Sequence, residues 1–477
     1  SVMAEGGINA ALNTKGEEDS PEQHYTDTLT AACGLADPNA VWGMTQAASE
    51  LVRSLHHLGV QFNVTDDDEL DLRNFGGQKK KRTAFAQSDT GKQLMTALID
   101  AVRREESAGT VERFPHHKFR TLLLSGNICG GCTVQDTYTG ELLRFVCDAV
   151  LIATGGLHGL FGDTTGSLAN TGEVTAELFR LGVPMANLEM IQYHPTTVEL
   201  GEKRMLLSEA ARGEGGRLFA LRNGKPWYFM EEKYPELGNL MPRDITAREV
   251  WTVSRDYEVF LDMTELPKEV MEHKLAGLVD DCQTYLHKDI RKEPIPILPG
   301  IHYFMGGIQV DERHRTSMRN LYAAGECCAQ YHGANRLGGN SLLGAIYGGQ
   351  IAAETACRET VSSPNMPCAE ESLLPELSPD AQMQMNRILL NALGVVRDAQ
   401  TLEAGIQEIR KLSGTLPLLG CAMLESALAR KESRGAHWRA DYPQRNDAVY
   451  CKTTVAHWNG QHIAISFESI PERRHDL

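Results

Sequence analysis

The spacing of apolar residues predicts a mixed chain in which helices and strands alternate. The segment that opens at Pro38 and stops at Gly59 carries apolar residues at helical spacing, so we expect one long helix there. Residues 121–154 instead favour strands, and the last of these, AVLIAT, is short, wholly apolar and followed by paired glycines. Such a strand is typical of a parallel sheet that meets a nucleotide. Thr171 and Gly182 bracket a further predicted helix.

Changes in this pattern divide the chain into regions. Beyond about residue 187, charged and proline-containing stretches replace the strand-and-glycine pattern, which resumes at residue 302. Two or three helices are expected between Met383 and Gly435, and strands from Val449 onward. We therefore predict an α/β + α fold: a nucleotide-binding domain interrupted by a capping domain, then a helical domain and a small C-terminal strand region. The predicted boundaries are 1–187 with 302–358, 188–301, 367–441 and 442–477.

One expected part of a dinucleotide-binding sheet does not occur in this sequence. Such a sheet opens with a strand and a G-x-G-x-x-G turn, followed by an acidic residue about 20 positions later. The chain starts instead with the glycine-containing loop SVMAEGGINAAL. We expect that the N-terminal fingerprint strand is absent from this chain; the alternative is that a cofactor's diphosphate is held in another way.

Composition and charge exclude some classes of function. A net charge of -16 and a pI near 5.5 argue against nucleic-acid binding, and they would repel an anionic substrate at long range. A site for an anion must therefore concentrate Arg and His locally. No apolar run approaches the roughly 20 residues that span a bilayer, and no signal peptide opens the chain, so we expect a cytoplasmic protein without a membrane span of its own.

The eleven cysteines are scattered, which favours reduced intracellular thiols over a disulfide framework. Cys129 and Cys132 form the one close pair that is separated by two residues, both glycine. A redox role is one interpretation of this pair. The favoured one is a hairpin turn at the two glycines, because paired glycines suit a tight turn.

The densest candidate for chemistry lies between His302 and Arg336 and extends into the next helix. Seven glycines fall between Gly325 and Gly349, and glycine lets backbone amides approach a bulky ligand closely. The His and the Arg are available to hold an anion. This combination suits a large planar cofactor beside a small acidic substrate.

Three further segments carry polar residues of the same kind: Gln192–Thr196, Ser208–Gly216 and Pro242–Asp244. Each has a purely structural explanation when it is taken alone. Together they supply an Arg- and His-rich set that suits a dicarboxylate, because a guanidinium forms a bidentate pair with a carboxylate. Glu209 and Arg212, at i and i+3, would share one face of a helix.

These segments resemble the flavoprotein subunits of succinate dehydrogenase and fumarate reductase, a family that includes L-aspartate oxidase. The resemblance runs nearly end to end. Its motifs are AEGGINAAL, DSPEQHYTDTL, FGGQKKKRTAFAQSDTG, QYHPT, SEAARGEGG, PRDI, KEPIPILPGIHYFMGG, HGANRLGGNSL and RKESRGAHWRADYPQRND. It implies that the interrupted domain is a Rossmann-like FAD-binding domain and that FAD is the cofactor; whether the link is covalent is left open.

The resemblance also implies roles for single residues. Arg243 would donate a proton to the substrate, and Glu209 and Arg212 would resupply it. His194 and Ser208 would hold one substrate carboxylate, and His302 and Arg336 would hold the other. The residues expected to contact the flavin are Ala4, Gly6, Gly7, Thr154, Gly155, Gly156, Glu173, Tyr303, Glu326, Arg336, Gly338, Asn340, Ser341 and Leu342. Glu173 stands where the family usually has aspartate, and Ser208 where it usually has threonine.

The residue type at position 75, here Phe75, distinguishes family members that act on different substrates. Aspartate oxidases typically carry a glutamate at this place, which pairs with the substrate's ammonium, whereas an apolar ring leaves such a cation unpaired at high cost. We therefore expect FAD-dependent interconversion of fumarate and succinate. L-aspartate oxidase and a non-catalytic, flavoprotein-like scaffold without flavin remain the alternatives.

Partners follow from the same resemblance. The chain lacks cluster-binding cysteine motifs, so we expect electrons to pass to an iron–sulfur subunit and a membrane-anchor module that reacts with quinone. These subunits would place the protein on the inner face of the cytoplasmic membrane. No metal site is predicted. The basic run Lys79–Arg82 is expected to be solvated or to face a partner, with the role of Arg82 left open.

Overall fold

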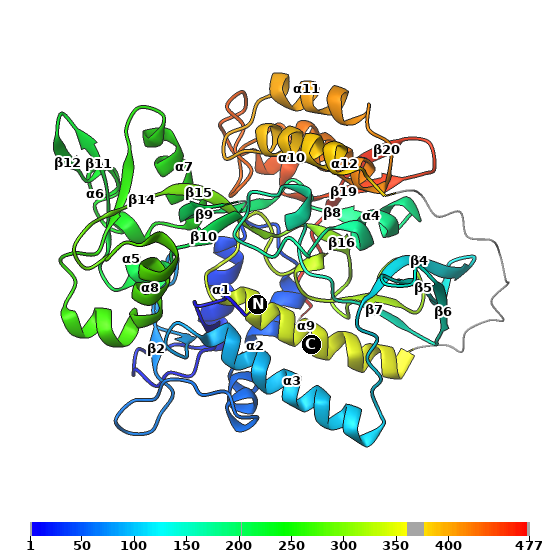
Figure 1. Cartoon of the computed structure of the whole chain (residues 1–477), viewed down its shortest axis with the longest axis horizontal. Coiled ribbons are helices and arrows are strands. Elements are labelled where there is room, and N and C mark those ends of the chain that lie inside the picture. Colours follow the sequence, from blue (N-terminus) through cyan, green and yellow to red (C-terminus); the bar gives the residue numbers. More distant parts are fainter. Residues whose placement is uncertain (1, 202, 360–375, 475–477) are drawn as a thin grey trace.

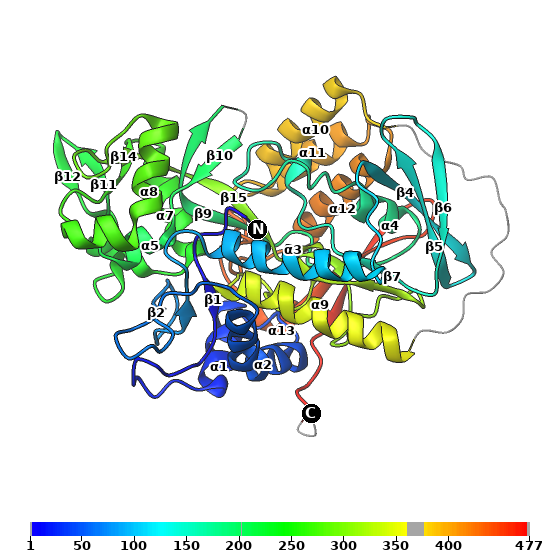
Figure 2. The same ribbon diagram turned by 60° about the horizontal axis from the view of Figure 1, so that its bottom comes forward.

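The computed structural model describes residues 2–201, 203–359 and 376–474. Figures 1 and 2 show the cap at one end, a three-stranded sheet at the other, and helices above and below the strands between them. The predicted start of the helical domain at residue 367 lies outside the described residues, as do residue 1 and residues 475–477. The other predicted domain boundaries stay predictions.

Five helices belong to the predicted FAD-binding part of the chain. Their bounds are α1 Pro21–Ala31, α2 Pro38–His57, α3 Thr90–Ala108, α4 Glu173–Arg180 and α9 Asn340–Glu359. The predicted helix after Pro38 is confirmed: Asp37 caps α2 through its carboxylate, and the buried stripe that includes Val41, Leu51 and Val52 packs into a core shared with α3 and α9. The helix predicted between Thr171 and Gly182 is confirmed as α4.

Four sheets accompany these helices. Strands β1 (Ile8–Asn9), β3 (Thr83–Ala84) and β2 (Leu72–Arg73) form the first, and β4 (His117–Ser125), β5 (Ile128–Asp136) and β6 (Leu142–Val146) the second. The apolar strand before the paired glycines is β7 (Val150–Ile152), which pairs in parallel with β17 (Leu321–Ala323). The fourth has the order β18-β16-β8-β19-β20, with bounds β8 Met185–Ala186, β16 Gly307–Gln309, β18 Cys328–Ala329, β19 Lys452–Trp458 and β20 Ile463–Ser469.

The hairpin predicted at Gly130 and Gly131 is wrong. The chain turns earlier, at Gly126 and Asn127, and both later glycines lie inside β5. Gly131 has φ of +142°, and a Cβ there would overlap the Phe145 carbonyl of β6. The pair of glycines therefore lets β6 approach an irregular position in β5.

The cap is built from two sheets and short helices. β9 (Ile191–Leu200) lies between β10 (Lys203–Leu206) and β15 (Leu298–Phe304); β11 (Arg217–Arg222), β12 (Lys225–Trp227), β13 (Val259–Asp262) and β14 (Ile295–Pro296) form the other sheet. The helices are α5 (Glu209–Gly213), α6 (Phe229–Lys233), α7 (Arg243–Ser254) and α8 (Ala276–Asp281). A separate apolar core fills this part.

The helices predicted between Met383 and Gly435 are confirmed as α10 (Pro379–Ala392), α11 (Ala399–Ile409) and α12 (Thr415–Ala429). They share one core with α4, β8 and β16. The short helix α13 (Asp447–Tyr450) precedes β19 and β20, the strands expected from Val449 onward. No helix in the described ranges has the length and apolarity that a bilayer crossing requires.

Candidate active site

Helix starts place the central charged side chains. Ser208 is the N-cap of α5, where its Oγ accepts the Ala210 N–H at 3.4 Å, and Glu209 follows as the first helical residue. Arg243 is the first residue of α7, directly after Pro242. A fixed φ at proline and a capping serine both define where a helix begins, so these two local signals set the direction of the side chains that follow.

Arg243, Glu209 and Arg212, the three residues for which the resemblance implies proton transfer, form one buried ion cluster. Arg243 Nε donates to Glu209 Oε2 at 2.8 Å, and Arg212 Nη2 lies 3.4 Å from Glu209 Oε1. The Gly76 N–H also donates to Oε1, at 3.2 Å. Burial alone would raise the pKa of Glu209, but Arg243 and Arg212 outweigh it, so the pKa is lowered and the carboxylate is ionised.

His194 and His302 face each other, with ring centroids 5.2 Å apart. Burial, and then the charge of Arg243, hold the pKa of both imidazoles well below the ordinary range, so both are neutral. With its proton on Nε2, His194 accepts the Thr196 N–H at Nδ1 (3.3 Å), and Nε2 becomes a buried donor without a partner in the described structure. His302 Nδ1 lies 2.8 Å from Thr165 Oγ1.

Arg336 is a buried cation without a carboxylate partner among the described residues. Its guanidinium stacks on Tyr303 at 4.6 Å from the ring centroid, and its Nε makes no hydrogen bond. Burial, followed by the charge of Arg243, lowers the pKa of Arg336 to about 9. An arginine keeps its proton even so, and a buried charge of this kind is stabilised when an anion joins it.

Gln192 connects the two arginines that were predicted as separate features. Its Oε1 accepts from Arg243 Nη1 at 3.2 Å, and its Nε2 donates to the Arg336 carbonyl at 2.9 Å. The positive charge of Arg243 acts on both histidines and on Arg336 and lowers the pKa of each. The result is a buried site rich in Arg and His, which suits an anionic ligand.

Three of the glycines expected at the flavin pack closely against side chains of other segments. The Phe75 ring lies between two glycines that were expected at the flavin: a Cβ at either Gly6 or Gly338 would approach it to 3.1 Å. A Cβ at Gly156 would meet Glu326 Oε1 at 2.6 Å. Thr154 is exposed at the carboxyl end of β7, which is the end of a parallel strand where cofactors bind.

Hydrogen bonds from polar side chains hold the glycine loop at Gly338 and the start of α9 in place. Asn340, at the start of α9, accepts from Asn9 Nδ2 at 2.7 Å and lies 2.9 Å from His24 Nε2. Asn9 and Gln78 both donate to the Gly338 carbonyl, at 2.7 and 2.8 Å. The helix start and the glycine loop are therefore held by the N-terminal loop that carries Gly6 and Gly7.

Glu173 lies apart from these residues. Its carboxylate pairs with Lys118 at 2.9 Å, and Lys118 also contacts Glu376 at 2.8 Å. Arg82 differs from the rest of its basic run, since it is fully buried and pairs with Asp19 and Asp27, each at 2.8 Å. Of the remaining expected flavin residues, Leu342 packs in the core of α2 and α9, and Ala4, Gly7, Gly155 and Ser341 lie in the same glycine-rich segments.

Sequence reasoning missed several of the residues that complete the site. Gln192 opened a motif that was noted for its His, and Asn9 and Gln78 lie inside motifs valued for their glycines. The signal that could have found them is their amide chemistry, because an amide both donates and accepts and so can join two charged groups.

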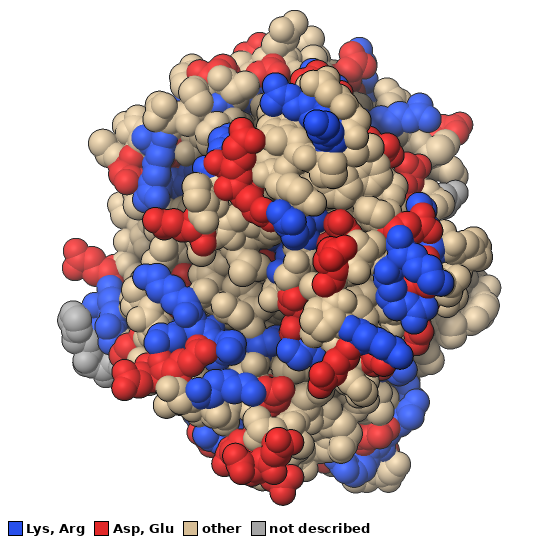
Figure 3. Space-filling model, turned by 90° about the vertical axis from the view of Figure 1, so that its left-hand side faces the viewer, with Lys and Arg blue, Asp and Glu red and all other residues tan. Residues whose placement is uncertain are grey.

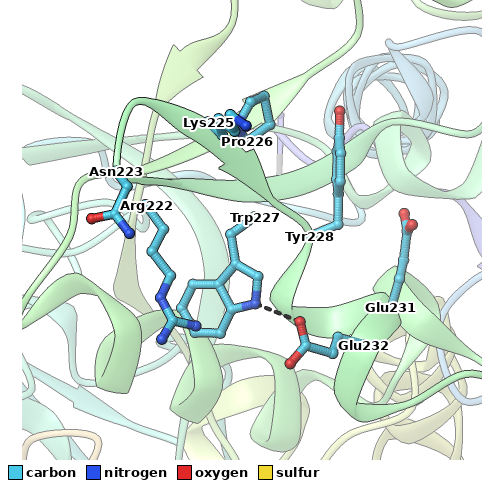
Figure 4. Close-up of a pocket in the computed structure, with 8 residues that line it drawn as sticks. All are labelled: Arg222, Asn223, Lys225, Pro226, Trp227, Tyr228, Glu231 and Glu232. Carbon is cyan, nitrogen blue, oxygen red and sulfur yellow. Dashed lines mark hydrogen bonds between the residues drawn. The ribbon is translucent and has the colours of Figure 1, made fainter.

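A surface depression lies on the cap, away from these residues. It has a volume of about 700 Å³ and is lined by Arg222, Asn223, Lys225, Pro226, Trp227, Tyr228, Glu231 and Glu232 (Figure 4). Trp227 Nε1 donates to Glu232 at 2.8 Å, and Arg222 lies over the Trp227 ring. Positive and negative side chains are mixed over this end of the molecule (Figure 3). Glu231 pairs with Arg217, which is not among the lining residues, and we assign this depression no ligand.

Comparisons with known proteins agree with this geometry. The FAD binding domain family matches residues 1–342, and the fumarate reductase flavoprotein C-terminal family matches residues 413–474. The succinate dehydrogenase flavoprotein subunit of Bacillus subtilis (strain 168) is 38% identical over 98% of this chain and 89% of its own length. The L-aspartate oxidase of Streptomyces coelicolor is 31% identical over 98% of this chain and 87% of its own length.

A solved structure shares the fold. A variant of the E. coli quinol fumarate reductase superposes with a TM-score of 0.87 at 26% identity, over 98% of this chain and 89% of that one. The predicted fold class and the FAD cofactor are thereby confirmed. The chain belongs to the family of FAD-dependent oxidoreductases that contains the flavoprotein subunits of succinate dehydrogenase and fumarate reductase, with L-aspartate oxidase as a relative.

Proposed function

We propose that this protein interconverts fumarate and succinate. The observation that carries the proposal is the buried guanidinium of Arg336, which has no carboxylate partner in the described part of the chain and lies near two neutral histidines and the Arg243–Glu209 pair. A dicarboxylate would supply the anion that Arg336 lacks at one end and would meet His194 Nε2 at the other. Ser208, at the N-cap of α5, would complete the second clamp.

The charged cluster supports a proton route. Reduction of fumarate adds one hydride and one proton across the double bond, and bound FAD in its reduced form would supply the hydride. Arg243 would give the proton to the other carbon. Glu209 touches Arg243 on one side and Arg212 on the other, so a proton that enters through Arg212 and Glu209 restores Arg243. Oxidation of succinate reverses these transfers.

The surroundings of Arg243 support its place in the proton route. Arg243 is only 7% exposed. Its Nε and Nη2 both donate to Glu209, so the carboxylate that would return the proton is already hydrogen-bonded to the guanidinium.

Phe75 favours this substrate over L-aspartate. Its side chain is 3% exposed and packs against Gly6 and Gly338, and a phenyl ring offers no carboxylate to an ammonium. A substrate ammonium buried there would be left without a partner, at a cost of several kcal/mol. L-aspartate oxidase remains the alternative because the family includes it.

Electron partners belong to the same proposal. The relatives are named as subunits, and a flavin that accepts two electrons from succinate must pass them on. We propose an iron–sulfur subunit as the next carrier and a quinone-reactive membrane module beyond it. These partners would locate the protein at the inner face of the cytoplasmic membrane.

An anaerobic assay of fumarate-dependent oxidation of reduced viologen tests the proton donor. For Arg243→Lys with FAD retained, we expect a loss of about 10²–10⁴-fold, the usual contribution of a general acid. Arg248→Lys is the matched control, because Arg248 lies on the same helix and stacks on Trp438 at 3.9 Å. Near-normal turnover of Arg243→Lys would remove Arg243 from this role.

A further inference from the structure

His24 is a fully buried histidine of α1 that the proposed mechanism does not use. Its Nε2 lies 2.9 Å from Asn340 Oδ1, across 316 positions of sequence. Asn340 is also fully buried and is the first residue of α9, directly after the glycines Gly338 and Gly339. His24 therefore contacts, from the side of α1, one of the segments expected at the flavin.

One backbone carbonyl fixes the direction of every hydrogen bond in this group. The Gly338 carbonyl can only accept, so the group of Asn9 that lies 2.7 Å from it is the amide Nδ2, which also donates to Asn340 Oδ1 at 2.7 Å. Asn340 Nδ2 lies on the other side and donates to Thr28 Oγ1 at 2.9 Å. Because an amide oxygen has no proton to give, the proton between His24 and Asn340 belongs to His24 Nε2.

The second ring nitrogen of His24 carries no proton in this arrangement. Nδ1 is buried and makes no hydrogen bond within the described residues, so a proton there would be an unpaired buried donor. Burial, and then the charge of Arg82, lower the pKa of His24 to about 3. Asp19 and Asp27 hold the Arg82 guanidinium, each at 2.8 Å. His24 is therefore a neutral ring whose single N–H is given to Asn340.

The Asn340 side chain is held at both of its polar atoms. Oδ1 accepts two hydrogen bonds, which fill its two lone pairs, and Nδ2 donates to Thr28. The first N–H groups of a helix have no partner within it, and the partial positive charge at this end favours a negative group nearby. A fixed Asn340 side chain therefore fixes the direction of the first turn of α9.

We propose that His24 is a positioning residue for the cofactor: its Nε2–H fixes Asn340 and so orients the first turn of α9 toward the flavin. Two-electron reduction at neutral pH adds negative charge to a flavin, so a helix N-terminus oriented toward it stabilises the reduced form more than the oxidised form. His24 then raises the reduction potential of the flavin without contacting the substrate. The inference goes beyond the proposed function, since it concerns FAD and not the dicarboxylate.

The test is an anaerobic redox titration of the FAD-loaded protein against a reference dye, followed by the flavin spectrum. His24→Leu fills much of the space of the ring but donates no hydrogen bond, so Asn340 Oδ1 loses one of its two donors. At a fixed potential, the ratio of reduced to oxidised flavin should fall by roughly two- to fivefold, the share that a helix N-terminus contributes to a nearby charge.

A rescue by glutamine separates the hydrogen bond from packing. The amide nitrogen of glutamine reaches the place of a histidine Nε2, so His24→Gln keeps the donor and should keep the wild-type ratio. Asparagine ends near the place of Nδ1, so His24→Asn should behave like His24→Leu. Leu29→Ala is the control on the same helix, because Leu29 packs in a separate cluster with Val41 of α2. Its Tm should fall while its flavin ratio stays that of wild type.

The outcomes distinguish this inference from a general loosening of the fold. Equal ratios in His24→Asn, His24→Gln and wild type would overturn it, as would a Leu29→Ala ratio that falls as far as that of His24→Leu. Loss of FAD from His24→Asn alone would support it, whereas loss of FAD from both His24→Asn and His24→Gln would contradict the role of the single N–H. Fumarate turnover is measured separately, so its absence in wild type would remove the proposed function and leave this result standing.

Discussion

At the scale of single residues, the site is built from charges that the fold leaves in need of partners. Arg336 is buried and stacks on the Tyr303 ring, without a carboxylate in salt-bridge distance among the described residues, whereas Glu209 is shared by two arginines and a backbone N–H. A buried charge without a counter-ion is costly, and folds retain one where a ligand completes it. We therefore expect the buried charge of Arg336 to lower the stability of the ligand-free protein and the ion pairs of Glu209 to raise it.

Replacing Arg336 should separate stability from binding. In Arg336→Met, a side chain of similar length removes the buried charge, so we expect the Tm of the FAD-loaded, substrate-free protein to rise. Malonate affinity should fall by about 100-fold or more, since two charge-assisted hydrogen bonds are lost. Arg204→Met is the contrast: Arg204 donates to Thr197 at 2.6 Å and pairs with Asp163, and its loss should lower Tm. A lower Tm for Arg336→Met would argue against an uncompensated charge.

The pH dependence of stability should identify the charge on Glu209. Because its folded pKa is lowered, ionised Glu209 contributes stability above its unfolded pKa of about 4.5, and that contribution is lost as pH falls through the folded value. Glu209→Gln should thus have a lower Tm than wild type at pH 7, with a gap that closes on acidification. Thermal unfolding of both proteins from pH 7 to pH 3.5 measures the gap. A gap that stays constant would mean that Glu209 is not ionised in the folded protein.

At the scale of elements, apolar spacing predicted α2 and the helices α10 to α12, whereas it gave no prediction for α1 and α3, and the paired glycines led to a wrong turn. The buried stripe of α2 is visible in the sequence because helical spacing over twenty residues is a strong signal. Gly130 and Gly131 gave the wrong prediction because paired glycines mark a hairpin turn and an irregular strand position equally. The neighbouring strand β6 decides between a turn and an irregular strand position. A local sequence pattern holds no information about that neighbour.

This reassignment of the two glycines predicts unequal costs of substitution. Gly131→Ala combines a left-handed φ with overlap on the Phe145 carbonyl, so it should destabilise by about 2–4 kcal/mol. Gly126→Ala is the matched control in the actual turn, where φ is +59° and no atom lies within 4 Å of the added Cβ; it should cost about 1 kcal/mol. Urea unfolding followed by circular dichroism compares them, and equal costs would place the turn elsewhere.

At the scale of the whole molecule, buried ion pairs join parts that are distant in sequence. Arg430 donates to Glu189 at 2.7 Å and to Glu432 at 2.9 Å, and Glu189 also accepts from Thr454 at 2.6 Å. Residues after α12 are in this way fixed to the start of the cap and to β19. Long-range contacts also limit what a sequence can reveal about the site. Gln192 lies 144 positions from Arg336, and only the folded chain brings them together.

Removing one partner of the buried ion pairs around Arg430 should lower the free energy of unfolding. Glu189→Gln leaves the guanidinium of Arg430 with one carboxylate fewer in a fully buried place, and we expect a loss of about 3–5 kcal/mol. Glu425→Gln is the control, since its partner Arg410 is 64% exposed and such a pair contributes about 0–1 kcal/mol. Comparison of Tm values measures both. If the two substitutions cost the same, the buried network does not join these parts.

The substrate itself is the most direct test of the central claim. The FAD-loaded wild-type protein should oxidise reduced viologen anaerobically when fumarate is added, and should show no oxygen-dependent turnover of L-aspartate. Phe75→Glu should gain affinity for L-aspartate, because it supplies the carboxylate that the ammonium needs. Rapid turnover of L-aspartate by wild type, without turnover of fumarate, would contradict the account.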